Sequence, residues 1–131
     1  MFVTDTHPLV WYATNKVANL PARTLAIFEA ANKSERVIHI PTAALFECAM
    51  LEKRGEVQFD DGFERWANNL LKKSGFFAAE MSLSIISRAV GLGMNKDPFD
   101  KIIVATAIEL DLPLITKDVA ITESSLVEVY W

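Results

Sequence analysis

Residues 36–54 read RVIHIPTAALFECAMLEKR, and this stretch decides the fold class. The first part, Arg36 to Ile40, is a short and nearly continuous apolar run, typical of a strand that is covered on both faces. Pro41 and Thr42 then begin a predicted helix that runs to about Arg54, and the next residue is a glycine, which often ends a helix. A strand that passes directly into a helix is the repeating unit of a parallel sheet with helices on its faces.

The same alternation continues along the chain. Further strands are predicted near both ends and in the middle, at residues 2–5, 76–80, 114–116 and 127–130. Helices are predicted between them, at residues 9–14, 20–32, 60–73, 82–91 and 98–110, with a turn at 5–8. This order predicts an α/β fold, a three-layer α/β/α sandwich around a mainly parallel sheet of about four or five strands with right-handed crossovers.

The composition narrows the class of protein. A chain of 131 residues with 51% hydrophobic and 23% charged residues fits one hydrophobic core, so residues 1–131 are expected to form a single domain. No apolar run approaches the roughly 20 residues that span a bilayer, and the start of the chain lacks the regions of a signal peptide. The single cysteine, Cys48, excludes an internal disulfide and suits a reducing compartment, so we expect a cytoplasmic protein.

The net charge of −4 argues against a protein that simply binds the phosphate backbone of nucleic acids, because such proteins are usually basic. The same charge does not exclude a nuclease. Bound metal ions would offset a cluster of carboxylates locally.

Five acidic residues stand where a packed chain has little structural use for a charge. They are Asp5, Glu47, Asp97, Asp100 and Asp118. Asp5 and Asp118 lie at the carboxyl ends of predicted strands, and Asp97 and Asp100 lie at a predicted helix start. Glu47 lies nearly two turns into the helix that follows the second strand. Ligands of open parallel sheets gather outside the carboxyl ends of the strands, so this fold can bring all five to one edge. Converging carboxylates repel one another unless a cation joins them, which predicts a divalent-metal site and a hydrolase.

Most of these acids also have a structural interpretation. Asp5 can form an Asx turn, and Asp118 can cap a following helix. Asp97 and Asp100 surround a proline at a helix start, which suits an N-cap and an acid in the first turn. Glu47 has the weakest structural explanation, because its neighbours at helical spacing are apolar. Thr116, two residues before Asp118, could hydrogen-bond a ligated carboxylate or a water molecule.

Four segments share one further property: each carries an acid of this set. They are FVTDTH (2–7), IPTAALFE (40–47), DPFDKIIVATA (97–107) and LITKD (114–118). In this order, and with the ending VEVYW (127–131), they closely resemble the PIN-domain family, and among its members the VapC-like toxin ribonucleases of prokaryotic toxin–antitoxin modules. The resemblance covers the whole chain.

The resemblance implies an endoribonuclease that depends on Mg²⁺ or Mn²⁺. It places the family's core acids on Asp5, Glu47, Asp100 and Asp118. Asp5, Asp100 and Asp118 are then metal ligands, and Glu47 is either a ligand or the group that positions the attacking water. Asp97 is a further candidate ligand, an extra acid that occurs in a subset of relatives. The resemblance also implies a homodimer, an RNA substrate, no membrane, and a small antitoxin whose C-terminal segment blocks the acidic groove.

Other classes of α/β protein fit the sequence less well. A haloacid-dehalogenase-type phosphatase needs a second aspartate two residues after Asp5, where this chain has His7. A dinucleotide-binding domain needs a glycine-rich first turn, which is missing here. One alternative stays open: a non-catalytic binding module whose acids cap helices and whose acidic groove docks a basic partner peptide. That alternative predicts no metal-dependent activity.

Overall fold

The computed structural model describes residues 1–131 and contains one five-stranded sheet. The strand order is β3-β2-β1-β4-β5, and every neighbouring pair is parallel. The strands are β1 (Phe2–Thr4), β2 (Ile38–Pro41), β3 (Phe76–Ala79), β4 (Leu114–Ile115) and β5 (Val129–Tyr130). The predicted α/β class and parallel sheet are therefore confirmed.

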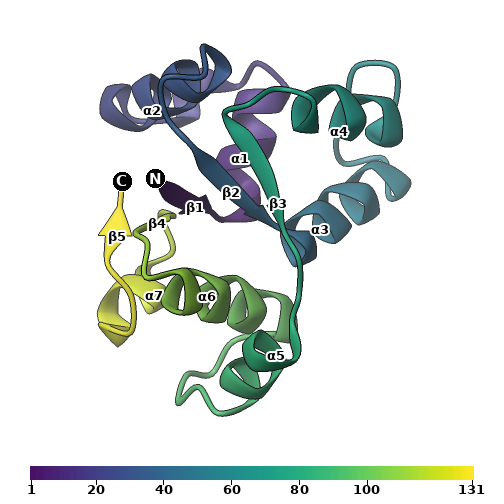
Figure 1. Cartoon of the computed structure of the whole chain (residues 1–131). Coiled ribbons are helices and arrows are strands. Elements are labelled where there is room, and N and C mark those ends of the chain that lie inside the picture. Colours follow the sequence, from purple (N-terminus) through teal and green to yellow (C-terminus); the bar gives the residue numbers. More distant parts are fainter.

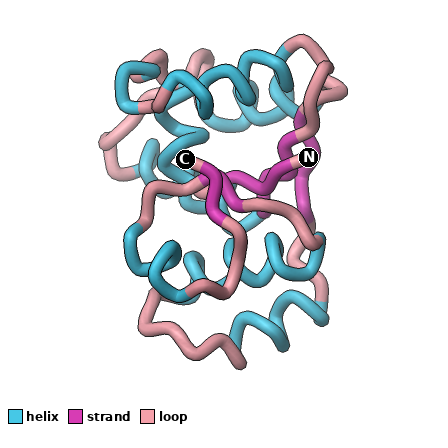
Figure 2. Tube along the Cα trace, turned by 90° about the vertical axis from the view of Figure 1, so that its left-hand side faces the viewer, coloured by secondary structure: helices cyan, strands magenta, loops and turns pink.

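Seven α-helices flank this sheet, together with one short 3-10 helix, η1 (Val17–Asn19). The α-helices are α1 (Thr6–Ala13), α2 (Ala22–Asn32), α3 (Thr42–Lys53), α4 (Phe63–Leu71), α5 (Leu83–Val90), α6 (Pro98–Leu110) and α7 (Val119–Ser124). Figures 1 and 2 show the strands as a central layer, with α1 to α4 on one side and α5 to α7 on the other. None of the helices combines the length and the apolar character that a membrane span requires.

The first helix begins earlier than predicted. Residues 5–8 were expected to form a turn, but α1 starts at Thr6. The reason is local: a carboxylate oxygen of Asp5 accepts a hydrogen bond from the backbone N–H of Thr6 at 2.7 Å, and Pro8 lies in the first turn, where a helix does not need its missing N–H. The helix predicted from residue 60 begins later, at Phe63, after Gly62 with a φ of 88°.

The hydrophobic core contains the central strands and much of α6. Strand residues Val3, Ile38 and Leu114 are completely buried, and so is much of α6, where Ile103, Val104, Ala105 and Ala107 are all 0% exposed. In the register of β1 with β4, Thr4 is the partner of Ile115. The residues that follow these two strands therefore leave the sheet side by side.

Candidate functional site

A cleft of about 330 Å³ opens where β1 and β4 end, and all five acids singled out above line it. Asp5 comes from the end of β1, Glu47 from α3, Asp97 and Asp100 from the start of α6, and Asp118 from the segment after β4. The other lining residues are Thr6, His7, Pro8, Trp11, Lys96 and Lys117. Residues up to 113 positions apart in the sequence thus share one cavity.

Asp5 is the most buried of these acids, with 8% of its surface exposed. Its Oδ1 accepts from the Thr6 backbone N–H at 2.7 Å, and its Oδ2 accepts from the Thr116 hydroxyl at 2.7 Å. The Thr116 oxygen in turn accepts from the backbone N–H of Asp118 at 3.1 Å. One fully buried threonine therefore links the two acids that follow β1 and β4.

Glu47 projects from α3 and is partly buried. Its Oε1 accepts a hydrogen bond from the Thr6 hydroxyl at 2.7 Å. Burial raises the pKa of the Glu47 carboxyl, and the charges of Asp5 and Asp97 raise it further, against the opposing effect of the Thr6 bond. A carboxyl group with a raised pKa among other acids is typical of a functional cleft.

The two acids at the start of α6 differ in role. Asp97 is exposed, and its Oδ1 caps the helix by accepting from the backbone N–H of Asp100 at 3.0 Å. Asp100 is more sheltered. Burial, together with the charges of Asp97 and Asp5, raises the pKa of Asp100 to about 6, although the nearby Lys96 lowers it.

Asp118 uses its two oxygens differently. Oδ1 caps α7 by accepting from the backbone N–H of Ile121 at 2.9 Å, and Oδ2 accepts from the Lys96 ammonium at 2.6 Å. Burial alone would raise the pKa of Asp118, but the hydrogen bonds from Lys96 and Ile121 outweigh it, so this pKa is lowered. The capping role considered for this residue is therefore real, and it leaves one oxygen facing the cleft.

Lys96 is a charged cleft residue that the sequence does not single out. Its Nζ lies 2.6 Å from Asp118 Oδ2 and 3.3 Å from Asp100 Oδ2. The bond to Asp118 raises the pKa of Lys96, although burial opposes it. Lys96 precedes Asp100 by four residues, which is the usual spacing of an ion pair within a helix, but Lys96 lies in the loop before α6, where that rule does not predict the direction of a side chain.

The donor types of the cleft suit a hard divalent cation, because Mg²⁺ and Mn²⁺ prefer carboxylate oxygens. Even so, no three Asp, Glu, His or Cys side chains in the structure come together closely enough to hold a metal ion. The ammonium of Lys96 lies between two of the candidate ligands, Asp100 and Asp118, and occupies the space where a metal ion would contact both. It also shows that these oxygens attract a cation.

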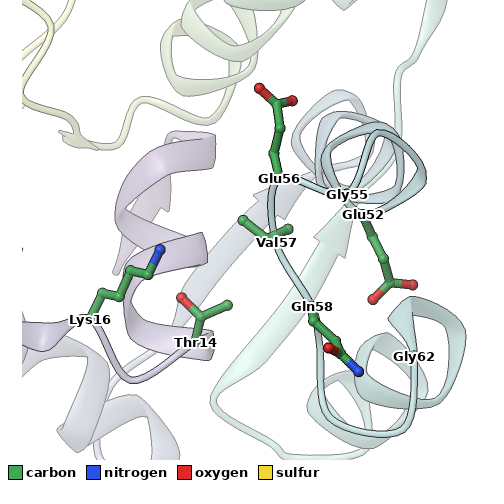
Figure 3. Close-up of a pocket in the computed structure, with 8 residues that line it drawn as sticks. All are labelled: Thr14, Lys16, Glu52, Gly55, Glu56, Val57, Gln58 and Gly62. Carbon is green, nitrogen blue, oxygen red and sulfur yellow. The ribbon is translucent and has the colours of Figure 1, made fainter.

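A larger cavity lies elsewhere in the protein. It has a volume of about 640 Å³ and is lined by Thr14, Lys16, Glu52, Gly55, Glu56, Val57, Gln58 and Gly62 (Figure 3). Its lining is polar, but the Glu52 carboxylate is held by the backbone: it accepts from Phe59 N and Phe63 N, each at 2.9 Å. No group of acids converges there, so we place the candidate site in the smaller cleft.

Comparisons with known proteins identify relatives of the same architecture. The model of the family described as PIN domain matches residues 2–124. Among solved structures, a chain of VapBC2 from Rickettsia felis, bound to a promoter DNA fragment, aligns with a TM-score of 0.71 at 15% identity, covering 98% of this chain and 96% of that one.

Two further structures align over nearly their full length. A toxin–antitoxin complex from Klebsiella pneumoniae gives a TM-score of 0.65 at 20% identity, covering 97% of this chain and 95% of that one. FitAcB from Neisseria gonorrhoeae gives 0.59 at 15% identity, with 100% and 97% covered. No curated protein sequence matches the chain. At such identities, likeness to a solved structure shows the fold alone.

Proposed function

The chain belongs to the PIN-domain family, and we propose that it is an endoribonuclease dependent on Mg²⁺ or Mn²⁺, the toxin of a toxin–antitoxin module. PIN domains are typically nucleases and generally depend on metal ions. The single observation that carries the proposal is the convergence of Asp5, Glu47, Asp100 and Asp118 on one cleft at the carboxyl edge of the sheet.

In this proposal Asp5, Asp100 and Asp118 hold the metal, with Asp97 at the rim as a further candidate. When bound there, a divalent ion would offset phosphate charge and lower the pKa of a water molecule. The protein's own contribution is to fix the ligands. The Thr116 hydroxyl and the Thr6 N–H orient Asp5, and the Ile121 N–H orients Asp118, before any substrate arrives.

Glu47 is suited to act on the attacking water. Its Oε1 is held by Thr6, while its Oε2 accepts no hydrogen bond within the protein and is free to accept one from water. The raised pKa of Glu47 makes it a stronger base than an ordinary carboxylate.

Lys117 lies at the cleft with its ammonium 5.0 Å from the centre of the Trp11 ring. A cation beside an aromatic ring is suited to bind the phosphate and the base of a nucleotide.

The partner proposals rest on the comparisons and on one surface. One of the similar solved structures is a toxin–antitoxin complex from Klebsiella pneumoniae, which supports a cognate antitoxin for this chain. A homodimer is supported by α5, where Leu83 and Val90 are 78% and 80% exposed. Light scattering of the purified protein beside Val90→Glu tests the dimer, which the added charge should dissociate.

The proposed activity is tested by incubating the purified protein with a pool of structured RNA, with Mg²⁺, with Mn²⁺ or with EDTA. We expect cleavage that requires the metal and is lost in Asp5→Asn. Asp111→Asn is the matched control, because Asp111 is exposed, lies at the far end of α6 and has a left-handed φ of 53° that asparagine also tolerates. Cleavage that persists in EDTA or in Asp5→Asn would contradict the proposal.

The competing function is the binding module with an acidic groove. It is favoured by one observation: Asp5, Asp97 and Asp118 each accept a hydrogen bond at a helix start, so they have a structural use without any metal. It predicts binding of a basic peptide that is unaffected by EDTA, together with no cleavage of RNA under any metal.

A further inference from the structure

Lys96 brings a positive charge into the middle of the acidic cleft. Its ammonium contacts Asp118 Oδ2 at 2.6 Å and Asp100 Oδ2 at 3.3 Å. Its side chain is 21% exposed, whereas the side chains of the other two ion pairs, Arg54–Glu56 and Arg88–Glu109, are between 30% and 60% exposed. Water therefore screens the Lys96 contacts less than it screens the other pairs.

The oxygens that Lys96 contacts are those that a metal would need. Asp118 Oδ1 is already engaged by the Ile121 N–H, so Oδ2 is the oxygen that it offers to the cleft. A cation that binds through Asp118 Oδ2 and Asp100 Oδ2 has to compete with the ammonium for both.

The position of Lys96 in the chain allows this competition. Lys96 lies in the irregular segment between α5 and α6, two residues before Pro98 begins the helix. Its charge stands at the end of a flexible four-carbon stem, so it can leave the cleft without unwinding a helix.

We infer that Lys96 is an internal counter-cation of the cleft, which holds Asp100 and Asp118 in the metal-free protein and must be displaced when a divalent cation binds. This inference rests on the proposed metal-dependent function and deepens it. Lys96 relieves the repulsion among the acids when metal is absent, and it weakens the affinity for metal in proportion to the strength of its own contacts.

The test is the dissociation constant of Mn²⁺, measured by calorimetry without RNA, for the wild type and Lys96→Met. We expect Mn²⁺ to bind Lys96→Met about tenfold more tightly or better, the scale of one charge-assisted hydrogen bond that no longer has to be broken. Lys117→Met is the matched control. It removes the same charge from the same cleft, but its ammonium lies over Trp11 and takes part in no ion pair with a carboxylate, so we expect a change of less than about threefold.

Lys96→Arg keeps a cation beside the two carboxylates, so it should bind Mn²⁺ no more tightly than the wild type does. Equal or weaker binding by Lys96→Met, or equal tightening by Lys117→Met, would overturn the inference while leaving the metal site intact. Binding of Mn²⁺ by none of these proteins would instead defeat the proposed metal-dependent function itself.

A second measurement needs no variant. Acetylation of lysines in the wild-type protein, followed by mass spectrometry, reports how free each amine is. With Mn²⁺ added, acetylation of Lys96 should rise several-fold relative to the exposed Lys72 on the surface, because the ammonium leaves its carboxylates. Unchanged or reduced acetylation of Lys96 at a Mn²⁺ concentration that saturates the calorimetric titration would overturn the displacement.

Discussion

Two glutamates of the same helix, Glu47 and Glu52 of α3, meet opposite surroundings. Both carboxylate oxygens of Glu52 accept hydrogen bonds from backbone N–H groups, those of Phe59 and Phe63, at 2.9 Å each. Glu47 accepts a single bond, from Thr6, and its pKa is raised by burial and, to a smaller extent, by the charges of Asp5 and Asp97. The larger cavity belongs to Glu52 and the smaller cleft to Glu47, so cavity size does not identify the site. What identifies it is the convergence of five acids on one cleft, two of which, Glu47 and Asp100, have raised pKa values.

The largest expected effect is on RNA cleavage and comes from replacing Glu47. Glu47→Gln should lower RNA cleavage by roughly 100-fold or more, since the neutral amide cannot take up a proton. The free energy of unfolding of the metal-free protein should stay the same or rise by up to about 1 kcal/mol, because like charges are relieved. Cleavage rates and urea unfolding measure the two effects. Full activity in this variant would remove Glu47 from the site.

The matched change at the other glutamate should have the opposite pattern. Glu52→Gln should lower the free energy of unfolding by about 2 kcal/mol. The amide offers one acceptor oxygen where the carboxylate offers two, so the backbone N–H of either Phe59 or Phe63 loses its partner. Mn²⁺ affinity and RNA cleavage should remain those of the wild type. If Glu52→Gln lost activity while remaining folded, the distinction between the two glutamates would be wrong.

Thr116 tests whether the acids of the cleft depend on buried hydrogen bonds, because its fully buried hydroxyl bonds to both Asp5 and Asp118. Thr116→Val removes the donor to Asp5 Oδ2 and the acceptor for Asp118 N, so we expect a loss of about 1–2 kcal/mol in stability and weaker Mn²⁺ binding by about tenfold. Thr116→Ser keeps the hydroxyl and should retain most of the Mn²⁺ affinity. Equal affinities in the valine and serine variants would show that the hydroxyl does not position the ligands.

The smallest expected effect is a pH dependence. The pKa of Asp100 is about 6 in the folded protein and has the ordinary value of 3.8 when unfolded. Between these values the folded state holds a proton that the unfolded state has lost. The stability of the metal-free protein should therefore fall by about 1 kcal/mol as the pH rises from about 4 to about 6, after allowance for solvent screening.

Chemical denaturation at several pH values, beside Asp100→Asn, isolates this effect, because the amide removes the titrating group. Protons compete with metal for the same carboxylate, so Mn²⁺ binding should strengthen as the pH rises through about 6. The same pH slope of stability in both proteins would assign it to another group.

The sequence predicts α6 well and α1 less well, for physical reasons. The helix predicted at residues 98–110 has those bounds in the structure, because Asp97 caps it, Pro98 starts it and its interior is continuously apolar. The start of α1 depends on the Asp5 cap, and the same aspartate also suits a turn, so the local sequence leaves the choice open.

The candidate site shows the same division. Its acids could be singled out because charges are conspicuous beside buried strands. Their partners could not, since the Thr6–Glu47 bond joins residues 41 positions apart and the direction of Lys96 is set by the loop before α6. Single-domain organisation of residues 1–131 and the roles of the five acids remain predictions.

The most direct test of the central claim is the location of the metal. Crystals of the wild-type protein soaked in Mn²⁺ and measured at the manganese absorption edge should give an anomalous peak within the cleft, bound by oxygens of Asp5, Asp100 or Asp118, with the Lys96 ammonium moved away from Asp118. An anomalous peak only outside the cleft, or none at a Mn²⁺ concentration that supports RNA cleavage, would contradict the account.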